Sequence, residues 1–286
     1  MPRKVLEEKL KQILAEDIGQ GDVTTAAVVP SGLTAEAAVI AKEAGIAAGI
    51  EEAVILAESL GLKVKTEVAD GEKVKNGQII MKISGDARTI LSVERTLLNL
   101  LARMSGIATT TRKLIDKLKK ANLTTKIAAT RKTAPGSHYF DKKAVFVGGG
   151  DPHRLHLDDM ILIKDNHIAV AGGIENAVKR AKQNASFSKK IEVEVSSVAD
   201  ALKAAEAGTD IIMLDNFSPR QIKETTALLK KAGFLGKILL EASGGITEEN
   251  LLKYASTRVD IISLGELTHS TKALDISLEI VKTRQI

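Results

Sequence analysis

Cysteine and tryptophan are absent from this chain of 286 residues, and aromatic residues make up only 2% of it. Without cysteine the chain has no disulfide framework and no thiolate metal site. The scarcity of aromatic rings argues against a protein that binds single-stranded nucleic acid, because such proteins stack bases on them. The core must rest on Ala, Val, Ile and Leu, which is typical of a parallel sheet covered by helices.

Long apolar runs and blocks of like charge are also missing. No run of about 18 apolar residues occurs, and residues 1–10 lack a signal-peptide core, so we expect a cytoplasmic protein with no membrane partner. The 41 basic residues are interspersed with 36 acidic ones, giving a net charge of +5 and no basic stripe. We therefore expect no nucleic-acid partner, and the mild excess of positive charge suits small anionic metabolites.

The first hundred residues have the pattern of a small α+β unit. Turn signals and apolar spacing predict helices and short strands in alternation. The expected helices cover 5–18, 51–60, 88–104 and 111–120, and the expected strands cover 34–41, 44–49, 63–68 and 78–83. Ser105 and Gly106 are expected to break the long helical pattern into two helices.

Beyond residue 120, short apolar runs alternate with helical patterns. The runs lie at 126–129, 160–163, 191–195, 211–214, 238–240 and 261–264. Ser218 with Pro219 predicts one helix start, and Thr247 with two following glutamates predicts another. This alternation indicates right-handed βαβ units, a parallel sheet and an open or closed α/β barrel, with a doubly wound open sheet as the alternative.

Polar residues follow nearly every predicted barrel strand. They are Thr130, Arg131, Lys132, Lys164, Glu192, Glu194, Asp215, Glu241, Ser243, Gly244, Gly245 and Gly265. Barrel enzymes build their sites at the carboxyl ends of the strands, so we expect one shared site at this edge.

Cationic and titratable side chains are concentrated between positions 131 and 167. Four of the five histidines lie there (His138, His153, His156 and His167), together with Arg131, Lys132, Arg154 and Lys164. Arginine binds carboxylates with two parallel hydrogen bonds and lysine adds point charge, so the cluster suits a substrate with several carboxylates or phosphates. The alternative is that these side chains lie on a solvent-exposed loop and bind no substrate. A zinc site is not favoured, because no HExxH motif occurs.

Glycine and carboxylate residues predict a phosphate half of the site. Gly244, Gly245 and Gly265 could offer backbone amides to a phosphate, and Gly148–Gly150 are a further candidate for close backbone approach. Glu194 and Asp215 would face this phosphate and bind Mg²⁺ or ribose hydroxyls, unless Glu194 forms a salt bridge with Lys164. Neither a P-loop nor a GxGxxG motif is present, so ATP and NAD are not indicated.

Two lysines allow other functions. Lys164 at the end of a barrel strand could form a Schiff base, as in an aldolase. Lys82, within the segment 70–83, resembles the modified lysine of a biotinyl or lipoyl carrier hairpin.

The order of motifs along nearly the whole chain resembles the quinolinate phosphoribosyltransferase family, also called nicotinate-nucleotide pyrophosphorylase (carboxylating). The motifs are EDIGQGDVTT (16–25), VERTLLNLLARMSGIAT (93–109), TRKTAPG (130–136), GGGDPHRLHLDDMILIKDNH (148–167), IEVEV (191–195), MLDNF (213–217), EASGGI (241–246) and SLGELTHS (263–270).

The resemblance implies an architecture and an assembly. Residues 1–108 would form an open-faced α/β sandwich, rejoined by a C-terminal helix at 270–286, and residues 109–269 an incomplete, TIM-like α/β barrel. The enzyme would be a homodimer or a homohexamer whose active sites are shared between subunits, with Arg95 entering the site of its neighbour.

The resemblance also implies a reaction and residue roles. The enzyme would transfer phosphoribosyl from phosphoribosyl pyrophosphate (PRPP) to quinolinate with decarboxylation, in NAD biosynthesis. Arg95, Arg131, His153 and Arg154 would bind quinolinate, with Thr130 nearby; Lys132 and Lys164 would meet the pyrophosphate. Glu194 and Asp215 would serve the ribose and Mg²⁺, directly or through water, and Ser243, Gly244, Gly245 and Gly265 the 5′-phosphate.

Ser137-His138 departs from the family pattern, which has Leu-Arg at this point. A titratable group therefore replaces one cation near the site, which bears on local substrate affinity and its pH dependence. A nicotinate-specific or molybdenum-associated paralogue on the same scaffold is the nearest alternative.

Overall fold

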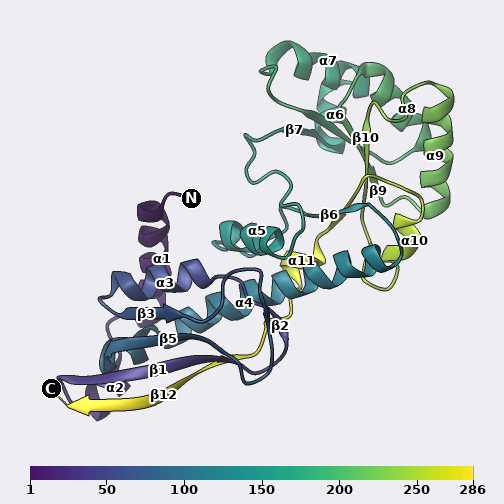
Figure 1. Cartoon of the computed structure of the whole chain (residues 1–286). Helices are drawn as coiled ribbons and strands as arrows, with labels where there is room; N and C mark the ends of the chain where they lie inside the picture. The colour runs from purple at the N-terminus through teal and green to yellow at the C-terminus, as the bar shows by residue number, and fades with distance from the viewer. Residues whose placement is uncertain (286) are drawn as a thin grey trace. The chain divides into compact units, whose positions relative to one another are not determined.

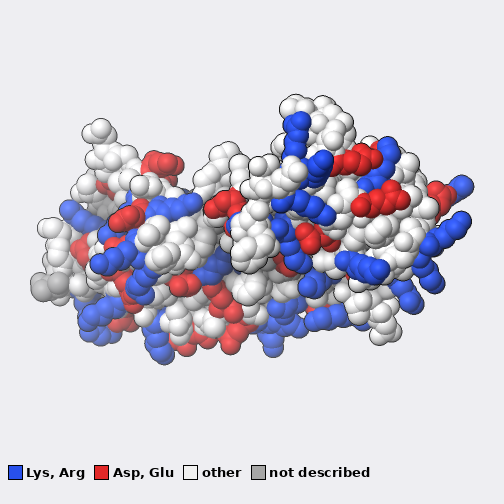
Figure 2. Space-filling model, turned by 90° about the horizontal axis from the view of Figure 1, so that it is seen from above, with Lys and Arg blue, Asp and Glu red and all other residues white. Residues whose placement is uncertain are grey.

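The computed structural model describes residues 1–285, and the chain divides into two compact units. The first unit comprises residues 1–112, 143–149 and 271 onward, and the second comprises residues 113–142 and 150–270. Within the described residues, no helix is long and apolar enough to cross a membrane. On the face drawn in Figure 2, basic and acidic side chains are intermingled, as the sequence indicated.

The first unit is built on an antiparallel sheet with the strand order β12-β1-β5-β3 (Figure 1). Its strands are β1 (Leu33–Ala41), β3 (Lys63–Thr66), β5 (Ile79–Asp86) and β12 (Ile276–Gln285), and β2 (Gly45–Ile46) pairs separately with β4 (Lys73–Val74). The helices are α1 (Arg3–Ile18), α2 (Val23–Val28), α3 (Ile50–Ser59) and the start of α4 (Ala87–Lys120).

The predicted C-terminal helix is wrong, because the segment forms strand β12. Residues 276–285 contain four β-branched residues, and Ile276, Leu278 and Ile280 alternate with other side chains along the strand. The strand runs antiparallel to β1 along its whole length, with one bulge beside Glu36. By pairing with β1, strand β12 supplies hydrogen-bond partners to the backbone groups along the edge of β1. This gain outweighs any local preference of residues 276–285 for a helix.

The predicted break at Gly106 is also wrong, because α4 runs unbroken for 34 residues. Gly106 has another role: a Cβ atom there would lie 2.0 Å from the carbonyl oxygen of Lys272 and 3.0 Å from Cα of Ala273. Leu274 donates its backbone N–H to the carbonyl of Ala102 at 2.9 Å. The missing side chain thus lets the C-terminal segment pack directly on α4.

The second unit is an incomplete parallel barrel. Its strands are β6 (Lys126–Ala129), β7 (Ile161–Ile163), β8 (Ile191–Val195), β9 (Ile211–Asp215), β10 (Leu239–Ser243) and β11 (Ile261–Leu264), in the order β6-β11-β10-β9-β8-β7. Apart from β6, neighbours in the sheet are neighbours in the chain, which excludes the doubly wound alternative. Within the described residues β6 and β7 do not pair, and Asp151 bridges to Ala128 on β6 instead.

Helices cover the outside of this sheet, with α7, α8 and α9 side by side (Figure 1). The helices after α4 are α5 (His138–Val147), α6 (Asp165–Ala171), α7 (Ile174–Asn184), α8 (Val198–Ala207), α9 (Pro219–Lys231), α10 (Leu251–Ala255) and α11 (Glu266–His269). Ser218 caps α9 as predicted. Thr247 does not cap α10: its hydroxyl donates to Glu249 at 2.6 Å, and the helix starts at Leu251.

The contact at Gly106 predicts that a glycine-to-alanine substitution in this helix lowers stability. Glycine to alanine in a helix interior normally stabilises by up to about 1 kcal/mol. We expect Gly106→Ala instead to lower the free energy of unfolding by about 2 kcal/mol, because the methyl group overlaps the Lys272 carbonyl. Urea denaturation measures the change, with Lys119→Ala, an exposed position on α4, as the control. A stabilised Gly106→Ala variant would contradict the close packing.

Candidate active site

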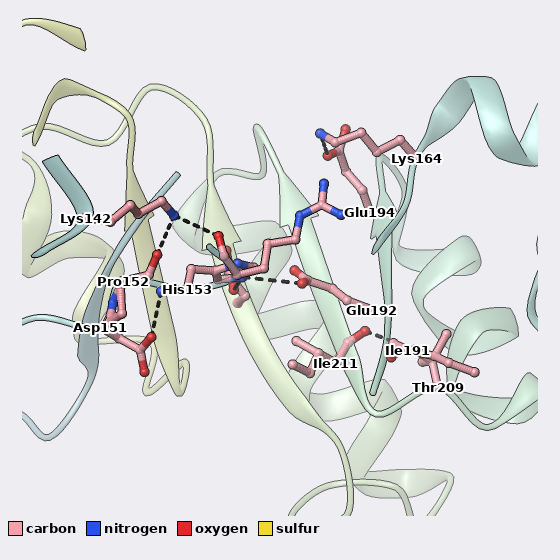
Figure 3. A network of polar contacts seen from close by, with 12 residues as sticks. Lys142, Asp151, Pro152, His153, Lys164, Ile191, Glu192, Glu194, Thr209 and Ile211 are labelled. Carbon is pink, nitrogen blue, oxygen red and sulfur yellow. Dashed lines mark hydrogen bonds and ion pairs between the residues drawn. The ribbon is translucent and has the colours of Figure 1, made fainter. Parts of the chain in front are cut away.

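The centre of the barrel end is His153, whose ring nitrogen Nε2 lies between two buried carboxylates (Figure 3). Nε2 is 3.2 Å from Oε2 of Glu241 and 3.3 Å from Oε2 of Glu192. Glu192 lies on β8 and Glu241 on β10, and both side chains are fully buried. The sequence singled out His153, but it gave no role to these two glutamates.

The two carboxylates determine the charge of His153. Burial alone would lower the pKa of His153, but the bonds to Glu192 and Glu241 outweigh burial and raise the pKa to about 10. The ring is therefore an imidazolium at neutral pH. Burial raises the pKa of Glu192, against the opposing influence of His153. The three ligand atoms lie within 4.8 Å of one another, a spacing that suits a shared ring proton and also a metal ion.

The backbone around His153 is held in an uncommon conformation. His153 has φ 55°, in the left-handed region, and its N–H donates to Oδ1 of Asp151 at 2.7 Å. The ammonium of Lys142, on α5, donates to the carbonyl oxygens of Pro152 and, at 3.1 Å, Arg154. Fixed contacts on both sides thus hold the loop that carries His153 and Arg154.

Cations converge on this loop. Burial and the nearby charges of Arg154 and Arg131 lower the pKa of Lys142 to about 8. Burial and Arg131 also lower the pKa of Arg154. The structure therefore brings Arg131 and Arg154 together, as the sequence predicted. Lys142 was missed, because no sequence pattern separates it from the adjacent Lys143.

His138, the residue that departs from the family pattern, lies beside the same cluster. Its Nδ1 is 3.3 Å from the Thr133 hydroxyl, and its Nε2 bonds to the carbonyl of Leu155. Burial lowers the pKa of His138, and the charges of Lys142 and Arg131 act in the same direction, so the ring is neutral at neutral pH. This position therefore carries no positive charge at neutral pH, and its ring bonds to the loop instead.

Lys164 and Glu194 form the ion pair that the sequence left open as an alternative. Lys164 precedes α6, and its Nζ lies 2.6 Å from Oε2 of Glu194 on β8 (Figure 3). The amine of Lys164 is thus engaged by a carboxylate, whereas a Schiff-base lysine needs an amine that is free to attack a carbonyl carbon. The aldolase alternative thus loses its support.

Glu194 and Asp215 lie on one face of neighbouring strands. Glu194 is in register with Met213 on β9, and Asp215 lies two residues further along the same strand. Because side chains alternate across a strand, all three point to the same side. Two carboxylates at one strand edge are oxygen donors of the kind that Mg²⁺ prefers, so the residues present fit this ion.

The turn after β10 brings the backbone of two strand ends close together. Ser243 is in register with Asp215, and its carbonyl accepts from the N–H of Asn216 at 2.8 Å. Gly244 has φ 91°, and a Cβ atom there would lie 2.3 Å from Oδ1 of Asn216. Gly245 also has a positive φ, of 60°. Only glycine fits at Gly244, because of its positive φ and the close approach of Asn216.

Lys132 and Gly265 meet at the ends of β6 and β11. The carbonyl of Lys132 accepts from the Thr268 hydroxyl at 2.7 Å, and its N–H donates to the Thr130 hydroxyl at 3.2 Å. A Cβ atom at Gly265 would lie 3.3 Å from Cδ of Lys132 and 2.9 Å from the ring of His269. His269 was not among the predicted site residues.

Three other sequence candidates have different outcomes. Gly148 packs against α4, where a Cβ atom would lie 2.7 Å from the carbonyl of Ala108, so its role is in packing. Lys82 lies within β5 in register with Ala38 and Lys65, and not at the tip of a carrier hairpin. Arg95 is exposed on α4 in the first unit, and its role stays a prediction.

Comparisons with known proteins cover both units. The N-terminal domain model of quinolinate phosphoribosyl transferase matches residues 22–105, and the C-terminal domain model matches residues 107–279. A probable nicotinate-nucleotide pyrophosphorylase [carboxylating] from Methanocaldococcus jannaschii is 48% identical over 96% of this chain and 96% of its own. The human nicotinate-nucleotide pyrophosphorylase [carboxylating] is 39% identical over 89% of this chain and 85% of its own.

The fold agrees with a solved structure of the same group. The nicotinate-nucleotide pyrophosphorylase from Francisella tularensis matches with a TM-score of 0.89 and 37% identity, covering 98% of this chain and 97% of that one. Sequence matches over both domains and the fold lead to the same assignment: this chain belongs to the quinolinate phosphoribosyltransferase family.

Proposed function

We propose that this enzyme transfers phosphoribosyl from PRPP to quinolinate and releases pyrophosphate and CO₂, forming nicotinate mononucleotide for NAD biosynthesis. The observation that carries the proposal is the group of cations around one loop of the barrel end, in a chain that belongs to this family. Arg131, Arg154 and the imidazolium of His153 are three donors suited to the two carboxylates of quinolinate. A substrate with one carboxylate would leave part of this group without a counter-ion.

PRPP would bind along the other strand ends. The backbone at Ser243, Gly244, Gly245 and Gly265 would receive the 5′-phosphate, since a side chain at Gly244 or Gly265 would fill the space next to Asn216 or Lys132. Lys132 and Lys164 would face the pyrophosphate. Glu194 and Asp215 would hold the ribose hydroxyls and Mg²⁺, which, when bound, neutralises charge on the departing pyrophosphate.

The protein's contribution to the reaction is mainly position and charge. The bond from ribose C1 to pyrophosphate breaks with its electron pair on the leaving oxygen, and the pyridine nitrogen bonds to C1. The positive pyridinium then accepts the electron pair left at C2 when the 2-carboxylate departs as CO₂, and C2 takes up a proton. Arg131, His153 and Arg154 would fix the ring for attack, and the lysines would stabilise the leaving group.

The assembly remains part of the proposal. Arg95 is an exposed arginine on α4, available to the site of a second subunit in a homodimer or a homohexamer.

Arg131→Ala tests the dicarboxylate site. We expect kcat/KM for quinolinate to fall by about a hundredfold to a thousandfold, because an arginine–carboxylate pair contributes roughly 3–4 kcal/mol in a desolvated site. The assay follows CO₂ and nicotinate mononucleotide from quinolinate, PRPP and Mg²⁺, with nicotinate as the second substrate. Arg220→Ala, at an exposed position on α9, is the control. Near-normal turnover by Arg131→Ala, or turnover of nicotinate by the unmodified enzyme, would refute the assignment.

Gly244→Ala tests the phosphate cradle. The added methyl group would overlap Asn216, so we expect KM for PRPP to rise about tenfold or more while KM for quinolinate changes little. Gly236→Ala is a matched control, because Gly236 also has a positive φ but has open space around its Cβ position. Equal effects of both substitutions would show that backbone strain, and not the cradle, is responsible.

Asp215→Asn tests the proposed Mg²⁺ site. We expect chelation by EDTA to abolish turnover, and Asp215→Asn to raise the Mg²⁺ concentration for half-maximal rate about tenfold, because a charged ligand is lost. Asp116→Asn on α4 is the control. An unchanged Mg²⁺ requirement in Asp215→Asn would remove this residue from the metal site.

A further inference from the structure

Two fully buried glutamates have no role in the function proposed above. Glu192 and Glu241 come from strands β8 and β10, which lie on either side of β9, and both place Oε2 within 3.3 Å of the same nitrogen of His153. Nε2 is hydrogen-bonded to Glu241, whereas Glu192 meets it as an ion pair only. Both oxygens of Glu192 and Oε1 of Glu241 have no hydrogen-bond partner within the described residues. Burying two carboxylates with so few hydrogen bonds costs free energy. Their shared contact with His153 is therefore the feature to explain.

The geometry fixes which ring nitrogen is free. Both carboxylates meet Nε2, so Nε2 must carry a proton. Within residues 1–285, Nδ1 of His153 has no bonding partner. If the ring were neutral with its proton on Nε2, Nδ1 would present a lone pair and repel an anion. Only the doubly protonated ring offers Nδ1–H as a donor to a carboxylate.

Charges of both signs lie around His153. Glu192 and Glu241 face Nε2, Asp151 accepts the His153 backbone N–H, Lys142 donates to the carbonyl of Arg154, and Arg131 lies near Arg154. The cations favour loss of the second ring proton, and the carboxylates favour its retention. With the carboxylates present, the pKa of His153 is about 10.

We propose that Glu192 and Glu241 are positioning residues that hold His153 as a doubly protonated ring, so that its Nδ1–H is presented to a substrate carboxylate. The identity of that substrate rests on the proposed function. The protonation state of the ring does not, because the ring holds both protons before any substrate binds.

The first test measures the ring without substrate. The protein labelled with ¹⁵N-histidine has five imidazoles, and the His153 signals are identified by their loss in His153→Gln. We expect His153 of the unmodified protein to keep both ring protons from pH 6 to pH 9. In Glu241→Gln, we expect its titration to move down toward the ordinary range near 6.5, because one carboxylate is lost.

The second test measures kinetics as a function of pH. In Glu241→Gln, we expect KM for quinolinate at pH 8.5 to rise about tenfold to a hundredfold, the range for loss of a hydrogen bond to a charged group. At pH 6 the defect should be smaller, because the ring regains its second proton, while KM for PRPP changes little at either pH. A merely structural glutamate would raise both KM values without this recovery at low pH.

Glu52→Gln is the matched control. Glu52 is also fully buried and has a raised pKa due to burial, but it pairs with Lys143 in the first unit. We expect it to leave both KM values and the His153 signals unchanged.

Three outcomes would overturn the inference. The first is a single ring proton on His153 at pH 7.5 in the unmodified protein. The second is an unchanged His153 titration in Glu241→Gln. The third is a metal ion that is bound to the purified protein at one per chain and is lost in Glu241→Gln. Failure of quinolinate turnover with an unchanged His153 titration would refute the proposed function alone.

Discussion

The ion triad of His153, Glu192 and Glu241 is the interaction on which the catalytic half of this molecule depends. Its three side chains come from a loop and two strands, and all are largely or fully buried. A buried charge is tolerated only where a partner is fixed beside it. The left-handed backbone at His153 and the bonds from Lys142 to the same loop therefore belong to one arrangement, in which each charge requires the others.

The positions of residues along the barrel strands separate the contacts of His153 from those of Lys164. Glu192 and Glu194 are two residues apart on β8 and so share the inner face, but Glu192 lies deeper and contacts His153, while Glu194 is closer to the strand end and pairs with Lys164. One strand thus serves both halves. His153 and Arg154 lie in the loop before β7, Asp215 ends β9, and glycine residues follow β10 and β11. Under the proposed function, carboxylate binding and phosphate binding could therefore vary separately on the same strands.

The sequence predicted most of what short-range rules determine. Three strands, at 126–129, 191–195 and 261–264, had the predicted bounds, and the other barrel strands differed by a few residues. Arg131, Lys132 and Lys164 follow strand ends as predicted, and Asp215 is the last residue of β9. Polar residues at those positions are local features of the chain. The C-terminal helix and the break at Gly106 were wrong, because both depend on contacts between segments more than 160 residues apart. Local propensity holds no information about such partners.

The burial of three charged residues has a different physical origin. Glu192 and Glu241 were expected at the shared site but had no assigned role, and Lys142 was missed. All three are fully buried, and the sequence alone gives no sign that their charges leave water. Their burial makes sense only together: burial, with the nearby charges of Arg154 and Arg131, lowers the pKa of Lys142 to about 8. The two glutamates supply negative charge inside the same cluster. If the cations receive a dianion, as proposed, they must also stay assembled when no dianion is bound. Buried carboxylates that attract the cations without blocking Nδ1 of His153 meet that requirement.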